Sequence, residues 1–179
     1  SGIYRLAIPN LEIRRIFIEQ IRDWFQSEAW KNTSRLNLFC EAFAKADTLT
    51  VETQFNTYLK KTISIRDTAV KKEKKENFYH GILLGLLSYR EDWDIRSNAE
   101  SGEGFSDILI EIENEGIGIV IEVKYADNGN LDAECKKAME QIKNKAYDSE
   151  LIENGMTTII KYGIECWKKT CKVICMTSD

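Results

Sequence analysis

Glu122 and Lys124 are two charged residues, two positions apart, within the apolar run Ile119-Val120-Ile121-Glu122-Val123-Lys124. Such a β-branched run predicts a strand buried on at least one face. Because side chains alternate along a strand, Glu122 and Lys124 are expected to share one face and Val123 to take the other. Burying a carboxylate and an ammonium is costly unless other groups compensate them. The pair therefore predicts either a structural ion pair or a site where a divalent cation and a phosphate meet.

A second carboxylate, Asp107, opens the apolar segment Asp107-Ile108-Leu109-Ile110. The polar connection Glu113-Asn114-Glu115-Gly116 predicts a hairpin between strands at about 105–112 and 117–125. We therefore expect Asp107 to converge with Glu122 and Lys124 at one edge of the sheet. Carboxylate oxygens suit Mg²⁺ or Mn²⁺, which would lower the pKa of bound water and polarise a phosphate. Lys124 would then stabilise the remaining negative charge.

The spacing of apolar residues along the chain predicts the helices and strands that position these charged residues. Apolar residues at three- and four-residue steps predict helices at about 10–26, 34–45, 50–61, 74–89 and 131–148. Thr48 or Thr50 is expected to cap the third of them. Further strands are expected at 93–96, 157–166 and 171–176. This order predicts an α/β fold with a mixed central sheet flanked by helices. We expect an N-terminal helical module at 1–70 and a core domain at 71–179.

Composition narrows the classes of function. The chain has 179 residues, of which 43% are hydrophobic and 30% charged, as in a soluble globular protein. No apolar run approaches the roughly 20 residues of a membrane span, and no secretory signal is visible, so a cytoplasmic location without membrane contact is expected. The net charge of −4 argues against a generic basic nucleic-acid coat, but it allows an enzyme with local basic patches.

Cysteine and histidine usage argues against several common sites. The five cysteines form no Cys-x-x-Cys pair, and His80 is the one histidine of the chain. A structural zinc site and Ser-His-Asp or Cys-His catalysis are therefore disfavoured, and free thiols in a reducing compartment are expected. The segment 60–76 holds seven basic and three acidic residues. It predicts either a solvated surface or a contact with a phosphate backbone.

Taken together, these motifs resemble the PD-(D/E)xK nuclease superfamily, in which an acid opens the second core strand and Glu-x-Lys lies in the third. Asp107 and Glu122-Val123-Lys124 match that pattern. Further stretches resemble the branch found C-terminal to AAA-ATPase-like regions in bacterial proteins. They are residues 4–10, Glu76-Asn77-Phe78-Tyr79-His80-Gly81, Glu100-Ser101-Gly102-Glu103-Gly104 and 141–147. The resemblance implies a restriction-endonuclease-like core and a Mg²⁺- or Mn²⁺-dependent nuclease acting on nucleic acid, with DNA as the expected substrate.

The resemblance also implies roles for individual residues. Asp107 and Glu122 would be metal ligands, with the Val123 carbonyl as a third, and Lys124 would orient water or stabilise phosphate charge. Glu76 would be an accessory acid, and Gln141 would help to fix Lys124 or the water. Contacts to nucleic acid are expected from Lys71, Lys72, Lys74, Lys75 and Tyr147. Two positions depart from the branch: Phe105-Ser106 replaces Arg-Pro, and Ala99 replaces arginine, so positive charge beside the site is reduced.

Two other interpretations stay open. The first keeps the fold without catalysis, as a module that binds nucleic acid or regulates the ATPase-like region of the same full-length protein. The second is a helical interaction domain in which residues 1–65 form a homodimer or interdomain surface and the ion pair is incidental.

Overall fold

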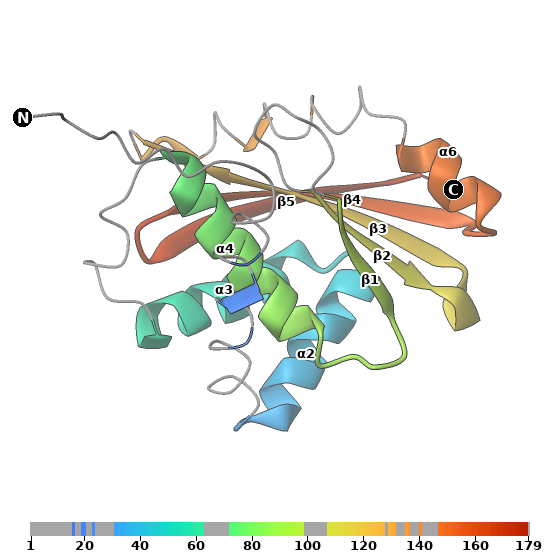
Figure 1. Cartoon of the computed structure of the whole chain (residues 1–179), viewed down its shortest axis with the longest axis horizontal. Helices are drawn as coiled ribbons and strands as arrows, with labels where there is room; N and C mark the ends of the chain where they lie inside the picture. Colours follow the sequence, from blue (N-terminus) through green and yellow to red (C-terminus); the bar gives the residue numbers. More distant parts are fainter. Residues whose placement is uncertain are drawn as a thin grey trace, which may run out of the picture.

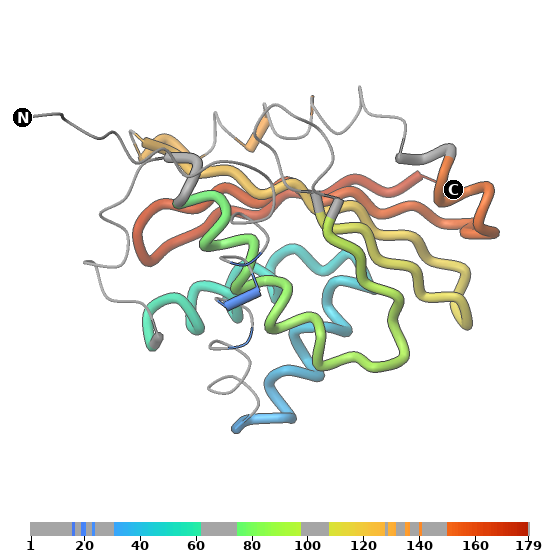
Figure 2. Tube along the Cα trace, in the orientation of Figure 1, coloured from blue at the N-terminus to red at the C-terminus, as the bar shows by residue number. Residues whose placement is uncertain are grey.

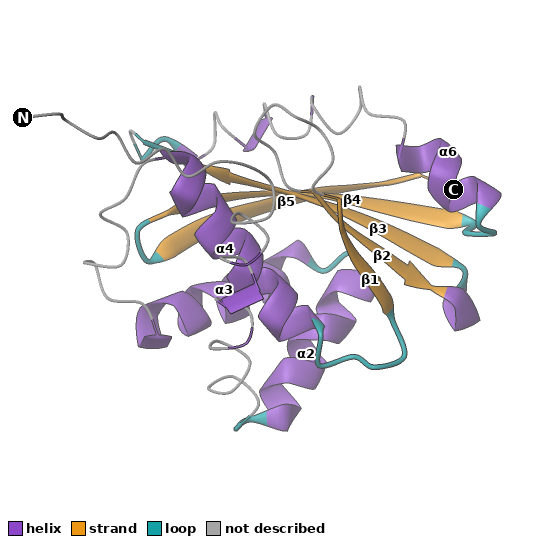
Figure 3. Cartoon of the chain, in the orientation of Figure 1, coloured by secondary structure: helices purple, strands orange, loops and turns teal. Residues whose placement is uncertain are grey.

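The computed structural model describes residues 31–62, 72–98, 107–127, 129–131, 135–136, 140 and 147–178, with the isolated positions 16, 19, 20 and 23. The first elements that are described over their whole length are the helices α2 (Thr33–Ala44), α3 (Thr48–Thr62) and α4 (Lys72–Leu87). The strands β1 (Asp94–Asn98), β2 (Asp107–Ile112) and β3 (Ile117–Tyr125) follow. The helix α6 (Tyr147–Glu153) precedes the strands β4 (Thr158–Trp167) and β5 (Thr170–Ser178). Figures 1 and 3 show the helices gathered around one twisted sheet.

The sheet has the strand order β1-β2-β3-β4-β5, so every strand lies beside its neighbour in sequence. All pairs are antiparallel except β3 and β4, which run parallel. The β2–β3 connection is the short 3₁₀ turn η2 (Glu113–Glu115), closed by Gly116 in the left-handed conformation at φ 65°. Glycine takes this conformation without the steric cost of a Cβ atom. The mixed sheet with flanking helices confirms the predicted fold class, and the predicted hairpin is also confirmed.

Helices α2 and α3 cover one face of the sheet and begin and end within a few residues of the predicted bounds. Phe39, Phe43 and Phe55 are fully buried in the core that they share with the sheet. The ring of Phe43 packs on Tyr162 of β4 with 4.8 Å between centroids. Asp47 caps α3, because its carboxylate accepts from the Thr50 backbone N–H at 3.0 Å and from the Thr50 hydroxyl at 2.6 Å. The expectation that a threonine caps this helix was therefore wrong.

Helix α4 lies against the same face and is buried along most of its length, as its apolar sequence predicted. It crosses close to β3, where the ring of Tyr79 stacks on that of Tyr125 with 5.9 Å between centroids. Figure 2 follows its trace from the edge near the β4–β5 turn towards the start of β1. The helix therefore runs across this face of the sheet, from the β4–β5 edge to the β1 edge (Figure 2).

The opposite face of the sheet carries a smaller apolar cluster of Leu109, Val120, Leu151, Met156 and Ile159. Leu151 belongs to α6, which begins at Tyr147, near the end of the helix predicted at 131–148, and ends at Glu153. Its side chain packs α6 against this face.

Other predictions fall outside the described residues. They are the domain boundary near residue 70 and most of the helices predicted at 10–26 and 131–148, which all stay predictions. No helix among the described residues has the length and apolar character needed to cross a membrane.

Candidate active site

Glu122 and Lys124 form an ion pair on one face of β3, with 2.5 Å between Lys124 Nζ and Glu122 Oε1. Glu122 is fully buried and Lys124 is 8% exposed. Val123 belongs to the large core on the opposite face. The alternation predicted from the sequence is thus confirmed: the two charged residues share a face, and the residue between them packs with α4 and its neighbours.

Position 107 lies beside this pair in the sheet. In the antiparallel β2–β3 ladder, Asp107 is the register partner of Glu122. Directly opposed positions of such a ladder have Cβ atoms about 4.5–5.5 Å apart on one face. The Asp107 side chain lies outside the described part of the structure. The backbone nevertheless brings positions 107 and 122 together from two strands, as the predicted hairpin required.

Glu76 connects the start of α4 with the end of β3. Its side chain is buried, with the residue 6% exposed, and Oε1 accepts a hydrogen bond from the Tyr125 backbone N–H at 3.4 Å. Tyr125 directly follows Lys124, so this carboxylate lies within one residue of the ion pair along the strand. Its predicted role as an accessory acid stays a prediction.

The remaining predicted residues lie mostly outside the described part. Gln141 and Lys71 are not described, nor are the side chains of Tyr147, Lys72 and Lys74. Lys75 is described, and its Nζ lies 4.4 Å from the centroid of the Tyr125 ring.

His80 is a buried structural histidine: its Nε2 lies 2.9 Å from Ser97 Oγ.

Glu165 is a buried carboxylate beside the ion pair that the sequence analysis missed. It is fully buried on β4 and is the register partner of Lys124 in the parallel β3–β4 ladder. Lys172 of β5 is its partner on the other side. The signal was present, because Glu165 interrupts the apolar stretch Ile164-Glu165-Cys166 as Glu122 interrupts its own strand. Charged positions therefore follow one another across three strands of this face.

The donor chemistry of the site suits a hard divalent cation. Glu122 supplies carboxylate oxygens on the face to which Asp107 is the neighbouring ladder position. Such oxygens are the ligands that Mg²⁺ and Mn²⁺ prefer. Among the side chains that the structure describes, no group of three or more histidine, cysteine or carboxylate residues could hold a metal ion. A metal at this site would therefore depend on Asp107 joining Glu122, with the Val123 carbonyl as the predicted third ligand.

A second charged cluster lies at the far end of the same sheet face, where it joins β1, β2 and α6. Arg96 of β1 pairs with Glu111 of β2 and, at 2.8 Å, with Glu150 of α6. Asn154 Nδ2 also donates to Glu111 Oε1, at 2.8 Å. Glu111 lies at the opposite end of β2 from Asp107, so this cluster holds α6 to the sheet and is separate from the ion pair.

Comparison with protein families identifies the chain at the level of a superfamily. The family model of the PD-(D/E)XK nuclease superfamily matches residues 74–175, which is more than half of the chain and runs from α4 into β5. A comparison with curated protein sequences gives no match. Members of this superfamily are usually nucleases and typically use divalent metals. The sheet topology, the Glu122–Lys124 pair and the matched residues agree, and the chain belongs to the PD-(D/E)XK nuclease superfamily.

Proposed function

We propose that this protein is a Mg²⁺- or Mn²⁺-dependent nuclease that hydrolyses phosphodiester bonds, with DNA as the substrate. The observation that carries the proposal is the buried Glu122–Lys124 pair, whose carboxylate lies at the ladder position opposite Asp107. Membership of the superfamily supports the same reaction class.

Each residue has a distinct task in this proposal. A bound divalent cation would polarise the scissile phosphate and lower the pKa of water. Asp107, Glu122 and the Val123 carbonyl would hold it. Lys124 donates its ammonium protons to a phosphate oxygen and stabilises the charge that develops there. Lys124 now contacts Glu122, and a cation held by that carboxylate would take over the compensation of its charge and leave the lysine available to the phosphate.

Supporting residues would fix this arrangement. Glu76 holds the Tyr125 backbone N–H, so it restrains the strand directly after Lys124. Gln141 is proposed to orient Lys124 or the attacking water, and Tyr147 to contact the nucleic acid. These two roles rest on the resemblance described above.

Cleavage of supercoiled plasmid DNA in Mg²⁺ or Mn²⁺ tests the proposal. We expect Lys124→Ala to abolish cleavage and Asp107→Ala to weaken metal binding. Lys45→Ala is the control, because it removes an exposed lysine that is paired with Glu41 on α2. Equal rates for wild type and Lys124→Ala would show that the proposed site is wrong.

One observation favours a second candidate, a catalytically silent module of the same fold. The Lys124 ammonium compensates the buried charge of Glu122 within the same strand, as a purely structural ion pair does. Such a module would bind nucleic acid or regulate an ATPase-like region. Titration calorimetry with Mn²⁺ separates the two, since the nuclease gives heat that is lost in Glu122→Gln, and the silent module gives none.

We also propose, from the resemblance of residues 4–10 and 141–147, that the ATPase-like region of the full-length protein is a partner. The comparison to make is cleavage by this chain alone and with that region added. An unchanged rate and no co-sedimentation would refute the partnership.

A further inference from the structure

The turn between β4 and β5 presents two lysines next to a tryptophan. It comprises Trp167, Lys168, Lys169 and Thr170, and Lys168 takes the left-handed conformation at φ 52°. The Thr170 hydroxyl donates to the Trp167 carbonyl at 2.9 Å and closes the turn. Lys168 is exposed, and its Nζ lies 4.3 Å from the centroid of the partly exposed Trp167 ring. The turn therefore displays positive charge on a defined backbone.

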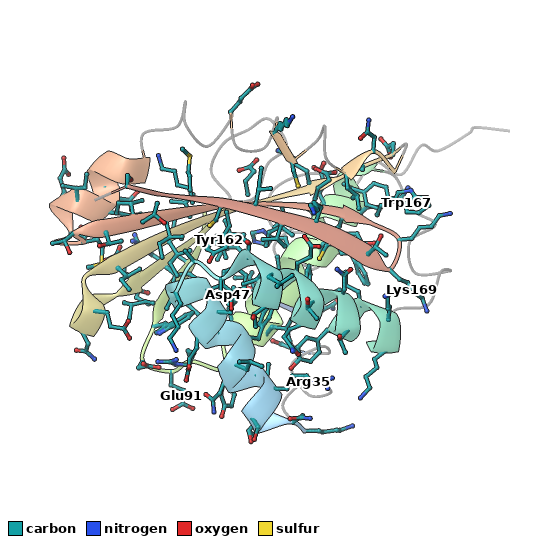
Figure 4. All side chains as sticks on the ribbon, turned by 180° about the vertical axis from the view of Figure 1, so that it is seen from behind. Arg35, Asp47, Glu91, Tyr162, Trp167 and Lys169 are labelled. Carbon is teal, nitrogen blue, oxygen red and sulfur yellow. The ribbon has the colours of Figure 1, made fainter. Side chains whose placement is uncertain are left out.

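This turn is tied to the rest of the molecule. The Tyr79 hydroxyl of α4 donates to the Lys168 carbonyl. A Cβ atom added at Gly129 would lie 3.2 Å from Trp167 Cε2, so the loop after β3 packs closely on the indole. Figure 1 shows the β4–β5 turn near the start of α4 and the end of β3. Figure 4 shows Trp167 and Lys169 together at this edge of the molecule, seen from behind.

Lys75 extends the same surface. Its Nζ lies over the Tyr125 ring, and Tyr125 in turn stacks on Tyr79, which holds the turn. We call Lys75, Trp167, Lys168 and Lys169 the cationic end. The exposed acid Asp127 lies in the loop between β3 and Gly129. Glu76, buried beside Lys75, accepts from the Tyr125 backbone N–H. The described residues of the end therefore hold three lysines against two acids, a small local positive charge, although the whole chain carries −4.

The cationic end lies next to the candidate active site. Trp167 follows Glu165 by two residues, and Glu165 is the ladder partner of Lys124. Two residues of a strand span about 7 Å. The turn therefore begins about 7 Å beyond the level of Lys124, at the end of the sheet towards which β3 and β4 both run.

We propose that the cationic end binds the phosphate backbone of the DNA substrate on one flank of the scissile phosphate. Lysine ammonium groups contact backbone phosphates without reading sequence, and the Trp167 ring under Lys168 helps to hold that ammonium at the surface. The proposal rests on the proposed function for its substrate class. It adds a location for the substrate that the family motif does not contain, since the motif ends at Lys124.

Fluorescence anisotropy of a labelled DNA duplex tests the proposal, using the full chain with Glu122→Gln to prevent cleavage. In this background, Lys168→Gln/Lys169→Gln is compared with Lys31→Gln/Lys45→Gln. Both double variants remove two lysine charges: Lys169 is partly exposed and the other three lysines are exposed, and Lys31 and Lys45 flank α2. We expect the first to weaken binding by about tenfold and to reduce the slope of log K against log salt by about 1.8, because each lost phosphate contact contributes about 0.9. Equal losses in both variants, or no DNA binding by the parent, would overturn the proposal.

Cleavage kinetics separate this proposal from the proposed function. With Glu122 intact, Lys168→Gln/Lys169→Gln should raise KM and leave kcat unchanged, because the turn contacts DNA away from the reacting phosphate. A lowered kcat with normal KM would contradict a binding role for the turn. If the wild-type chain cleaves no DNA but its DNA binding still depends on Lys168 and Lys169, the proposed nuclease function is wrong. The proposal that the cationic end binds DNA is then supported.

Discussion

Lys124 contacts the carboxylate of Glu122 two residues earlier on the same strand, and both side chains are almost completely withdrawn from water. Removing one member of a buried ion pair leaves an uncompensated charge, whereas removing both does not. The relationship between these residues thus affects stability as well as the proposed catalysis, and the two effects can be measured separately.

The first prediction concerns the stability of this pair without metal. We expect Lys124→Met to lower the free energy of unfolding by about 3–5 kcal/mol, because Glu122 is then buried without its partner. The double variant Glu122→Gln/Lys124→Met should lose less than the sum of the two single variants. Urea denaturation in EDTA measures all four proteins. Additive losses would mean that the two side chains do not interact.

The second prediction concerns Glu165, the buried ladder partner of Lys124. We expect Glu165→Gln to slow cleavage by about tenfold, in the range found for residues that surround a metal site. The substitution keeps the side-chain shape and removes the charge, so DNA affinity should stay unchanged. Steady-state cleavage and anisotropy measured on the same preparation check this. A wild-type kcat would show that Glu165 serves folding alone.

The third prediction concerns the cluster that fastens α6 to the sheet. Arg96→Ala should cost about 1–3 kcal/mol, because it deprives the buried Glu111 of a charged partner; the value is reduced because Arg96 is itself 39% exposed. Glu150→Ala is the matched control, because it removes the other carboxylate that pairs with the Arg96 guanidinium. Its side chain is 44% exposed, so less than about 1 kcal/mol is expected. Similar losses for both variants in chemical denaturation would contradict this ranking.

The fourth prediction is a loss of stability at alkaline pH. Burial raises the pKa of the Cys40 thiol to about 12, from 9.0. A thiol of the unfolded chain ionises from about pH 9 upwards, while the folded one stays protonated until about pH 12. The stability that Cys40 contributes is therefore complete below pH 9 and is lost as pH rises between these values.

At pH 10 this linkage amounts to about 1.4 kcal/mol for one such thiol. Burial also raises the pKa values of Cys166 and Cys171. Each of these thiols should add to the loss of stability of the wild-type protein at alkaline pH. Urea denaturation at pH 7 and pH 10 measures the difference, and Cys40→Ala should show a smaller decrease than wild type. An identical decrease in both proteins would mean that Cys40 does not ionise on unfolding.

The sequence predicted the sheet well because its signals are local. Glu122 and Lys124 stand out against β-branched neighbours, and the Glu115-Gly116 turn limits the hairpin to one register. The position of Asp107 opposite Glu122 followed from these two facts. The capping of α3 was missed because Asp47 and Thr50 both suit a cap, and only the backbone geometry decides between them.

The sequence shows that Glu165 interrupts an apolar stretch, but neither its place beside Lys124 nor that of the β4–β5 turn could be read from the sequence. Their positions depend on β4 lying parallel to β3, after a long intervening segment, and no local pattern fixes that register. Lys168 and Lys169 look like any exposed turn lysines until Tyr79, Tyr125 and the end of β3 are placed beside them. Contacts between residues far apart in sequence decide this part of the site.

The strand order also has a consequence for how the chain folds. Since each strand pairs with its neighbour in sequence, the β1–β2–β3 meander and the β4–β5 hairpin can both form through local contacts. Among the strand pairs, the β3–β4 junction requires the longest closure, over the segment between Tyr125 and Thr158 that includes α6, and this is the entropically costly one. Asp107 and Glu122 would thus be paired early, while Lys124 meets Glu165 only when the two halves join. Substitutions at this junction should slow refolding more than substitutions within either half.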